Sequence, residues 1–119
     1  MASILVVFST TPHANATAKD SLDFAMAATA YGHQVSGLFI DDGVFQLLNV
    51  APEQTFYQTK QPVKIVQSLG FYDIENIYIC QQSVDKRMLN PKSISSEYIS
   101  VDAIEIREIM ENHQFVVNL

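Results

Sequence analysis

The sequence predicts an α/β domain of three layers, α/β/α, with a mainly parallel sheet of about five strands. Short apolar runs rich in β-branched and aromatic residues recur along the chain, and segments of helical periodicity alternate with them. This alternation favours parallel strands with helices on both faces. The length of 119 residues and the few Gly and Pro residues indicate one globular domain over residues 1–119, without internal repeats.

Composition and charge argue against several classes of protein. A hydrophobic fraction of 48% supports a packed core, and a net charge of -6 argues against a nucleic-acid-binding surface. The single cysteine excludes an internal disulfide and fits a reducing compartment. The N-terminal apolar run is too short for a signal peptide or membrane span and lacks a basic flank, so we expect a cytoplasmic protein without a membrane partner.

The first part of the chain predicts two strands and the helix between them. A continuous apolar run over residues 4–8 is typical of a strand covered on both faces. After a polar loop over residues 9–15, residues 16–31 place apolar side chains at helical spacing, and Gly32 is a suitable C-terminal cap. Residues 34–40 carry the second predicted strand.

The middle of the chain is more irregular. The acidic turn Asp41-Asp42-Gly43 opens a short apolar helix over residues 44–48. Residues 49–61 are typical of a loop, because prolines and polar residues dominate there. A short helix over residues 63–69 then precedes the central strand, predicted over residues 77–79.

The last part of the chain predicts two further helices and two short strands. A helix over residues 83–89 ends before Asn90-Pro91, and an extended piece is expected over residues 97–99. Asp102 and Glu105 form an aspartate version of the capping box. The last helix has its apolar face at Ala103, Ile106, Ile109 and Met110, and the final strand covers residues 115–117.

Cys80 is the candidate for chemistry, because it lies where the central strand passes into a helix. The unpaired N–H groups and the positive dipole end at a helix N-terminus stabilise a thiolate or another anionic sulfur species. The alternative is a structural residue, since free cysteine is among the most buried residue types and behaves as a small hydrophobe.

Two loops are expected beside Cys80, because each follows the carboxyl end of a predicted parallel strand. Ligands and reactive groups gather at that edge of such a sheet. The two are the Ser9–His13 loop and the Asp41–Phe45 turn. Hydroxyls at Ser9–Thr11 could cradle a phosphate, although no glycine accompanies them and a loop that caps the first helix is the commoner outcome. His13 is a candidate proton carrier or thiol-orienting group, or else an ordinary loop histidine.

The acidic turn and the apolar residues after it have alternative explanations. Asp41 and Asp42 lack the accompanying ligands of a metal site, and capping of the next helix explains at least one of them, so we expect no metal and no cofactor. The segment that follows is more apolar than a short surface helix needs, which leaves core packing and a subunit interface both open. Its apolar residues are Val44, Phe45, Leu47 and Leu48.

Three strings of the sequence are specific when taken together: Phe8-Ser9-Thr10-Thr11-Pro12-His13, Ile40-Asp41-Asp42-Gly43-Val44-Phe45-Gln46-Leu47 and Gly70-Phe71-Tyr72-Asp73-Ile74-Glu75. With these strings, the chain as a whole resembles the TusC-type (DsrF-like) subunits of the DsrE/DsrF/DsrH sulfur-relay family. Leu22-Asp23 fits the family's first helix, and Cys80 and Ser83 match as well. Ala14 and Ser21 depart from the pattern, since glycine is expected at both positions.

The resemblance implies a subunit of a cytoplasmic heterohexamer with two copies each of TusB-, TusC- and TusD-like chains. Such a complex receives persulfide sulfur and passes it through a TusE-like carrier toward 2-thiolation of the wobble uridine of transfer RNA. The resemblance also implies that the sulfur-accepting cysteine belongs to the TusD-like chain, which leaves this chain a mainly structural or pocket-forming role. Two alternatives stay open: a flavodoxin-like domain that binds a flavin or nucleotide, and a stand-alone thiol sulfurtransferase that uses Cys80 with His13.

Overall fold

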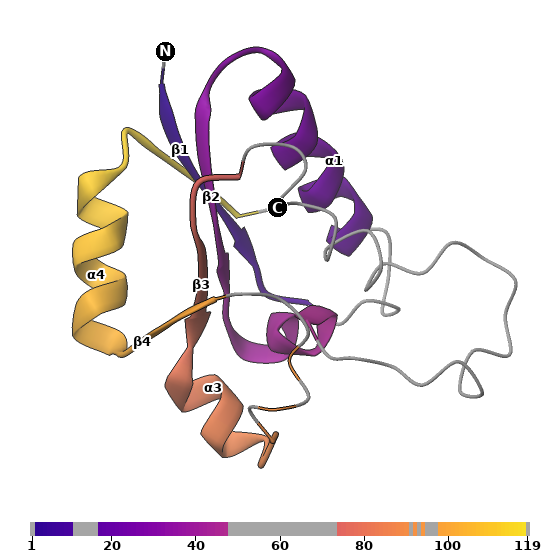
Figure 1. Ribbon diagram of the computed structural model, residues 1–119, viewed down its shortest axis with the longest axis vertical. Helices are drawn as coiled ribbons and strands as arrows, with labels where there is room; N and C mark the ends of the chain where they lie inside the picture. Colours follow the sequence, from indigo (N-terminus) through magenta and orange to yellow (C-terminus); the bar gives the residue numbers. More distant parts are fainter. Residues whose placement is uncertain are drawn as a thin grey trace, which may run out of the picture.

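The computed structural model describes residues 2–10, 17–47, 74–90, 92, 94 and 98–118, with the side chains of residues 17–19 left out. Its centre is a five-stranded sheet in the order β4-β3-β2-β1-β5, and every neighbouring pair is parallel. Figure 1 shows the sheet between its helical layers. The strands are β1 (Ser3–Phe8), β2 (Gln34–Phe39), β3 (Ile77–Cys80), β4 (Ile99–Val101) and β5 (Phe115–Asn118).

Helices cover both faces of this sheet, as the sequence predicts. One core cluster contains residues of α1 (Thr17–Ala30), the 3₁₀ helix η1 (Asp41–Leu47) and α3 (Gln81–Lys86), and we call this side the α1 face. The other cluster packs against α4 (Ala103–Asn112), and we call that side the α4 face. In Figure 1, α4 lies to the left of the sheet and α1 to the right. The fold is therefore a three-layer α/β/α arrangement.

The alternation of side chains along β1 explains why its whole sequence is apolar. Ile4, Val6 and Phe8 pack on the α1 face, whereas Leu5 and Val7 pack on the α4 face. All five side chains are at most 7% exposed. A strand with helices above and below has no solvent face, so no polar residue is needed in it.

Local signals place the ends of two helices as expected. After α1, Gly32 has φ of +87°, and its N–H donates to the Thr29 carbonyl while the His33 N–H donates to the Ala28 carbonyl. This pair of bonds is a Schellman motif, which needs the left-handed conformation that glycine adopts without strain. At the start of α4, the Asp102 carboxylate accepts from the Glu105 N–H, and the Glu105 carboxylate accepts from the Asp102 N–H.

Other boundaries differ from the prediction. The helix after the central strand begins at Gln81, two residues before the predicted start at Ser83, because β3 passes directly into α3 without a turn. The strand predicted over residues 97–99 covers Ile99–Val101 instead. The short helix after β2 begins at Asp41 and is a 3₁₀ helix. The predicted loop over residues 49–61 and helix over residues 63–69 lie outside the described residues.

None of the helices in the described part of the chain has the length and apolar character that a bilayer crossing requires.

Candidate functional site

The carboxyl edge of the sheet brings together the end of β1 and the segment after β2, as predicted. The Ile40 N–H donates to the Phe8 carbonyl over 3.0 Å, and the Gln46 side-chain amide donates to the Thr10 carbonyl over 2.9 Å. These two contacts hold the residue before η1 against the end of β1, and η1 itself against the loop that follows β1. Of the predicted Ser9–His13 loop, Ser9 and Thr10 are described, and the candidate His13 lies outside the described residues.

Gly43 packs its backbone against the end of β1. It is buried in η1, and a β-carbon built there would overlap the carbonyl of Phe8. Only glycine allows the backbone of η1 to approach the end of β1 this closely. The acidic turn therefore has a structural reason for its glycine.

The first two residues of η1 also hold α3. The Asp41 N–H donates to the Ser83 hydroxyl over 2.9 Å, and the Asp42 carboxylate lies 2.9 Å from Nη2 of Arg87. A second Arg87 nitrogen, Nη1, donates to the Ser83 carbonyl over 3.2 Å. Asp42 thus forms an ion pair with α3. Within the described ranges, no group of three or more His, Cys, Asp and Glu side chains could hold a metal ion.

Cys80 is the last residue of β3 and the N-cap residue of α3, and it is 7% exposed. Its side chain makes no capping hydrogen bond. Its register partner on β4 is Val101, which packs on the α4 face, whereas the preceding residue Ile79 packs on the α1 face. Because side chains alternate along a strand, Cys80 lies on the α4 face. It shares the carboxyl edge with η1 but points to the opposite side of the sheet.

A polar network crosses from α3 to β4 beside Cys80. The Ser100 hydroxyl donates to the Gln81 side-chain carbonyl over 2.5 Å, and the Gln81 amide donates to the Asp85 carboxylate over 2.8 Å. These bonds hold the first turn of α3 against the edge strand. The residue that follows Cys80 is therefore tied to β4 through its side chain.

For the four apolar residues of the segment after the acidic turn, core packing and a subunit interface were both open. The structure describes three of them, and they differ in burial. Val44 and Leu47 are fully buried and belong to the core cluster of the α1 face, which favours core packing for these two residues. Phe45 is partly exposed and remains an interface candidate, and Leu48 lies outside the described residues.

Gln46 is a residue of this edge that the sequence reasoning did not select. It is 1% exposed, and its Oε1 atom has no hydrogen-bond partner within the described part of the structure. Its amide nitrogen donates a hydrogen bond to the Thr10 carbonyl, and this bond explains why a polar side chain occupies a buried position. The sequence does contain a signal for Gln46, because a polar residue within an otherwise apolar segment indicates a buried hydrogen bond.

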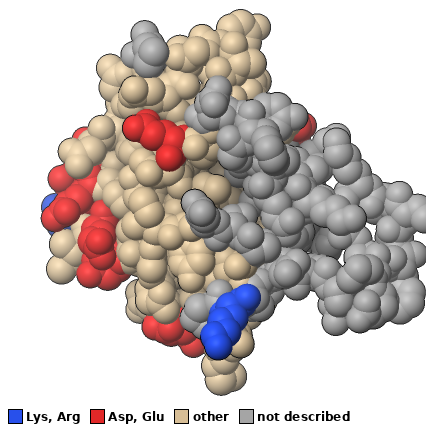
Figure 2. Space-filling view, viewed as in Figure 1, with Lys and Arg blue, Asp and Glu red and all other residues tan. Residues whose placement is uncertain are grey.

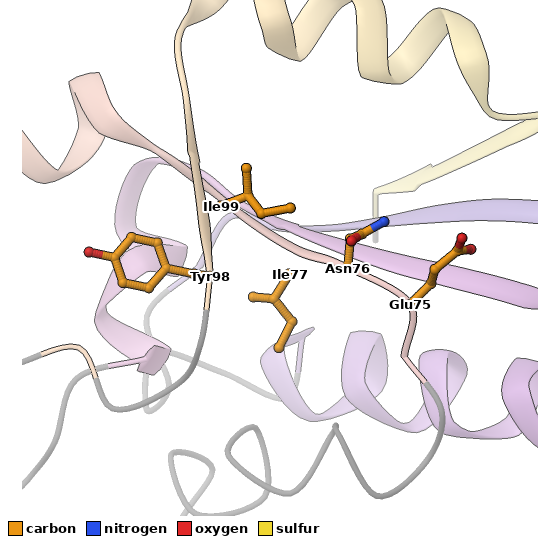
Figure 3. Close-up of a pocket in the computed structure, with 5 residues that line it drawn as sticks. All are labelled: Glu75, Asn76, Ile77, Tyr98 and Ile99. Atoms are coloured by element: carbon orange, nitrogen blue, oxygen red, sulfur yellow. The ribbon is translucent and has the colours of Figure 1, made fainter.

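An open pocket of about 250 Å³ lies at the other end of the sheet. Figure 3 shows Glu75 and Asn76 at one side of it and Tyr98 at the other, with Ile77 and Ile99 between them. These residues precede or begin β3 and β4, so the pocket lies at the amino ends of the strands. It is separate from Cys80 and from η1.

Comparison with known proteins decides the family. The sequence profile of the DsrE/DsrF-like family matches residues 2–119. The chain belongs to the DsrE/DsrF-like family. It is 34% identical to a TusC homolog of Vibrio vulnificus over 94% of both chains, and 34% identical to the TusC protein of Escherichia fergusonii over 98% of both.

A structural comparison agrees with this family. The crystal structure of the ychN protein from E. coli superposes with a TM-score of 0.85 over 100% of both chains, at 14% sequence identity. Such a likeness concerns the fold alone, and it confirms the predicted α/β/α architecture with its parallel sheet. In this chain, the fold places the ends of β1 and β3, η1 and α3 at one edge of the sheet.

Proposed function

We propose that this chain is the TusC-like subunit of a cytoplasmic TusBCD-type sulfur-relay complex. In the proposed complex, two copies each of TusB-, TusC- and TusD-like chains pass persulfide sulfur through a TusE-like carrier toward 2-thiolation of the wobble uridine of transfer RNA. The observation that carries the proposal is the similarity to TusC proteins over at least 94% of both chains in the two relatives compared above. Family membership also favours this function over a flavodoxin-like flavin or nucleotide site.

The role proposed for this chain within the complex is mainly structural. In sulfur transfer, an acceptor thiolate attacks the outer sulfur of a persulfide, and the donor cysteine leaves as a thiolate. The acceptor sulfur must be accessible to the donor, and Cys80 is only 7% exposed. Burial of Cys80 supports an acceptor cysteine on the TusD-like partner.

Co-expression with the TusB-like and TusD-like chains of the same source tests this function. We expect co-purification as a heterohexamer, identified by native mass spectrometry, and persulfide transfer from the assembled complex to the TusE-like carrier. A chain that fails to assemble with both partners would contradict the proposal.

A Cys80→Ser variant tests the division of roles. If the acceptor cysteine lies on the TusD-like chain, the variant complex should assemble and transfer persulfide at the wild-type rate. A matched substitution of the acceptor cysteine in the TusD-like chain should abolish transfer. Loss of transfer in the assembled Cys80→Ser complex would instead assign sulfur chemistry to Cys80.

A further inference from the structure

Two histidines lie at the amino ends of the strands that flank β1. His33-Gln34 leads into β2, and His113-Gln114 leads into β5. Because β1 lies between β2 and β5, the two dipeptides meet the start of β1 from opposite sides. Both histidines are far along the sheet from the carboxyl edge that carries Cys80 and η1.

Ala2, just before β1, is tied to the start of β2 by two hydrogen bonds. Its carbonyl accepts from the Gln34 N–H over 2.9 Å, and its N–H donates to Nδ1 of the half-buried His33 ring over 3.2 Å. The second bond uses a ring nitrogen as the acceptor, and an accepting nitrogen carries no proton. His33 therefore holds Ala2 only as a neutral ring with its proton on Nε2.

His113 has the opposite arrangement. Its Nδ1 lies 2.7 Å from the carbonyl oxygen of Ile109, in the last turn of α4. A carbonyl only accepts, so this Nδ1 carries a proton. Protonation of the other ring nitrogen keeps the bond and adds a positive charge at the helix end where the dipole is negative. The two histidines thus respond to acid in opposite directions.

Other ionisable groups of the described elements lie at this end of the sheet. They are Tyr31 after α1, Glu75 before β3 and Glu111 near the end of α4, where Glu111 pairs with Arg107. Within the described ranges, no ion pair or side-chain hydrogen bond joins any of them to His33. Figure 2 shows Asp or Glu atoms, and no Lys or Arg atoms, toward the upper end of the face in view, where Figure 1 places the N-terminus. Nearby carboxylates act on both histidines with the same sign, whereas the hydrogen bonds give opposite signs.

Ser3, the residue after Ala2, is held by groups that do not titrate. Its N–H donates to the Gln114 side-chain carbonyl over 3.1 Å, and its hydroxyl accepts from the Gln114 N–H over 3.0 Å. These bonds stay the same over the pH range in which histidine gains its proton. The effect of acid is therefore confined to Ala2 and does not extend into β1.

We propose that His33 is a pH-sensitive switch, which ties Ala2 to β2 when its ring is neutral and releases it when the ring is protonated. Protonation places a ring N–H against the Ala2 N–H, and two donors cannot bond to each other. Histidine is the side chain that changes charge between about pH 5 and 8. The stability that this bond contributes is therefore present at the upper end of that range and is lost as the pH falls through it. The switch goes beyond the proposed function and does not depend on partner subunits.

Nitrogen-15 NMR of the imidazole rings in the full chain tests the arrangement directly. Long-range proton–nitrogen spectra distinguish a protonated ring nitrogen from an unprotonated one. At about pH 8, we expect an unprotonated Nδ1 in His33 and a protonated Nδ1 in His113. A protonated Nδ1 in His33 under these conditions would overturn the switch.

The same substitution at both positions measures the effect on stability. Asparagine keeps an acceptor and a donor at the δ position but does not titrate. Between about pH 8 and about pH 5.5, the melting temperature of the wild type should fall by about 4 °C relative to His33→Asn, because one hydrogen bond is lost. Relative to His113→Asn, it should stay unchanged or rise. Shifts of the same sign in both comparisons would assign the effect to long-range charge and overturn the switch.

Hydrogen exchange locates the change within the wild-type chain. In a chain that retains residue 1, the protection factor of the Ala2 amide should fall about fivefold between the two pH values, while that of Ser3 stays constant. Protection factors already correct for the intrinsic pH dependence of exchange. Equal changes at Ala2 and Ser3 would contradict a switch at His33, and they would leave the proposed function untouched.

Discussion

Gly43 lies directly against the carbonyl of Phe8, although the two residues belong to different elements of the fold. Phe8 ends strand β1, and Gly43 belongs to η1, which follows the neighbouring strand β2. Both partners of the contact are backbone groups, so neither can move aside as a flexible side chain would. This contact sets how closely η1 covers the carboxyl edge of the sheet.

Gly43→Ala should therefore lower the free energy of unfolding by about 3 kcal/mol, because the added β-carbon overlaps the Phe8 carbonyl and forces the backbone apart. Urea unfolding of the purified chain measures the change. Gly32→Ala is the matched control, since nothing lies within 4 Å of a β-carbon there and only the positive φ opposes it. That control should lose about 1 kcal/mol. Equal losses for the two variants would contradict the proposed overlap.

Asp102→Ala should destabilise the chain by about 1 kcal/mol, because it removes one half of the capping box at the start of α4. Thermal unfolding together with helix content from circular dichroism checks this prediction. Glu108→Ala changes an exposed residue of the same helix and should have almost no effect. If the two variants proved equally stable, the capping box would contribute little.

Asp42→Asn should cost less than about 1 kcal/mol at low salt, since the Asp42 carboxylate is about half exposed and its ion pair with Arg87 is screened. The loss should shrink further at high salt. Ser83→Ala should cost about 1 kcal/mol at any salt concentration, because it removes the neutral hydroxyl that accepts from the Asp41 N–H. Chemical unfolding at two ionic strengths compares the variants, and a salt-independent loss for Asp42→Asn would be inconsistent with the ion pair.

Cys80 should react at least about tenfold more slowly with a thiol reagent such as DTNB in the native chain than in denaturant, because reaction requires an accessible thiolate. Its exposed fraction of 7% is the reason for this expectation. Absorbance of the released thiol follows both reactions. Rapid native labelling would show that Cys80 is accessible to persulfide donors and would favour a direct role in sulfur transfer.

Sequence patterns predicted the features that depend on local interactions. The fully apolar run of β1, the glycine at the end of α1 and the Asp102–Glu105 capping box each involve residues within a few positions of one another. Such signals indicate strands and helix ends directly. The alternation of these elements was then sufficient to predict a parallel sheet with helices on both faces.

Individual side-chain pairs between distant residues could not be predicted. Asp42 and Arg87 are 45 residues apart, and no local pattern pairs them. The start of α3 was placed two residues late because Cys80 is an N-cap without a side-chain bond, so the usual capping signal is absent. The face of the sheet on which Cys80 lies could not be predicted either. Side chains alternate between the two faces along a strand, so the face of Cys80 follows only when the boundaries of β3 are known.

The strand order has a consequence for how the chain is made. β1 lies between β2 and β5, and its contacts with β5 join residues 111 positions apart. During synthesis, β1 therefore keeps one edge without its native neighbour until β5 has left the ribosome. Contacts of such long range slow folding, and an unpaired apolar edge is prone to aggregation. The late arrival of β5 therefore sets how long this edge of the nascent sheet stays open to wrong partners.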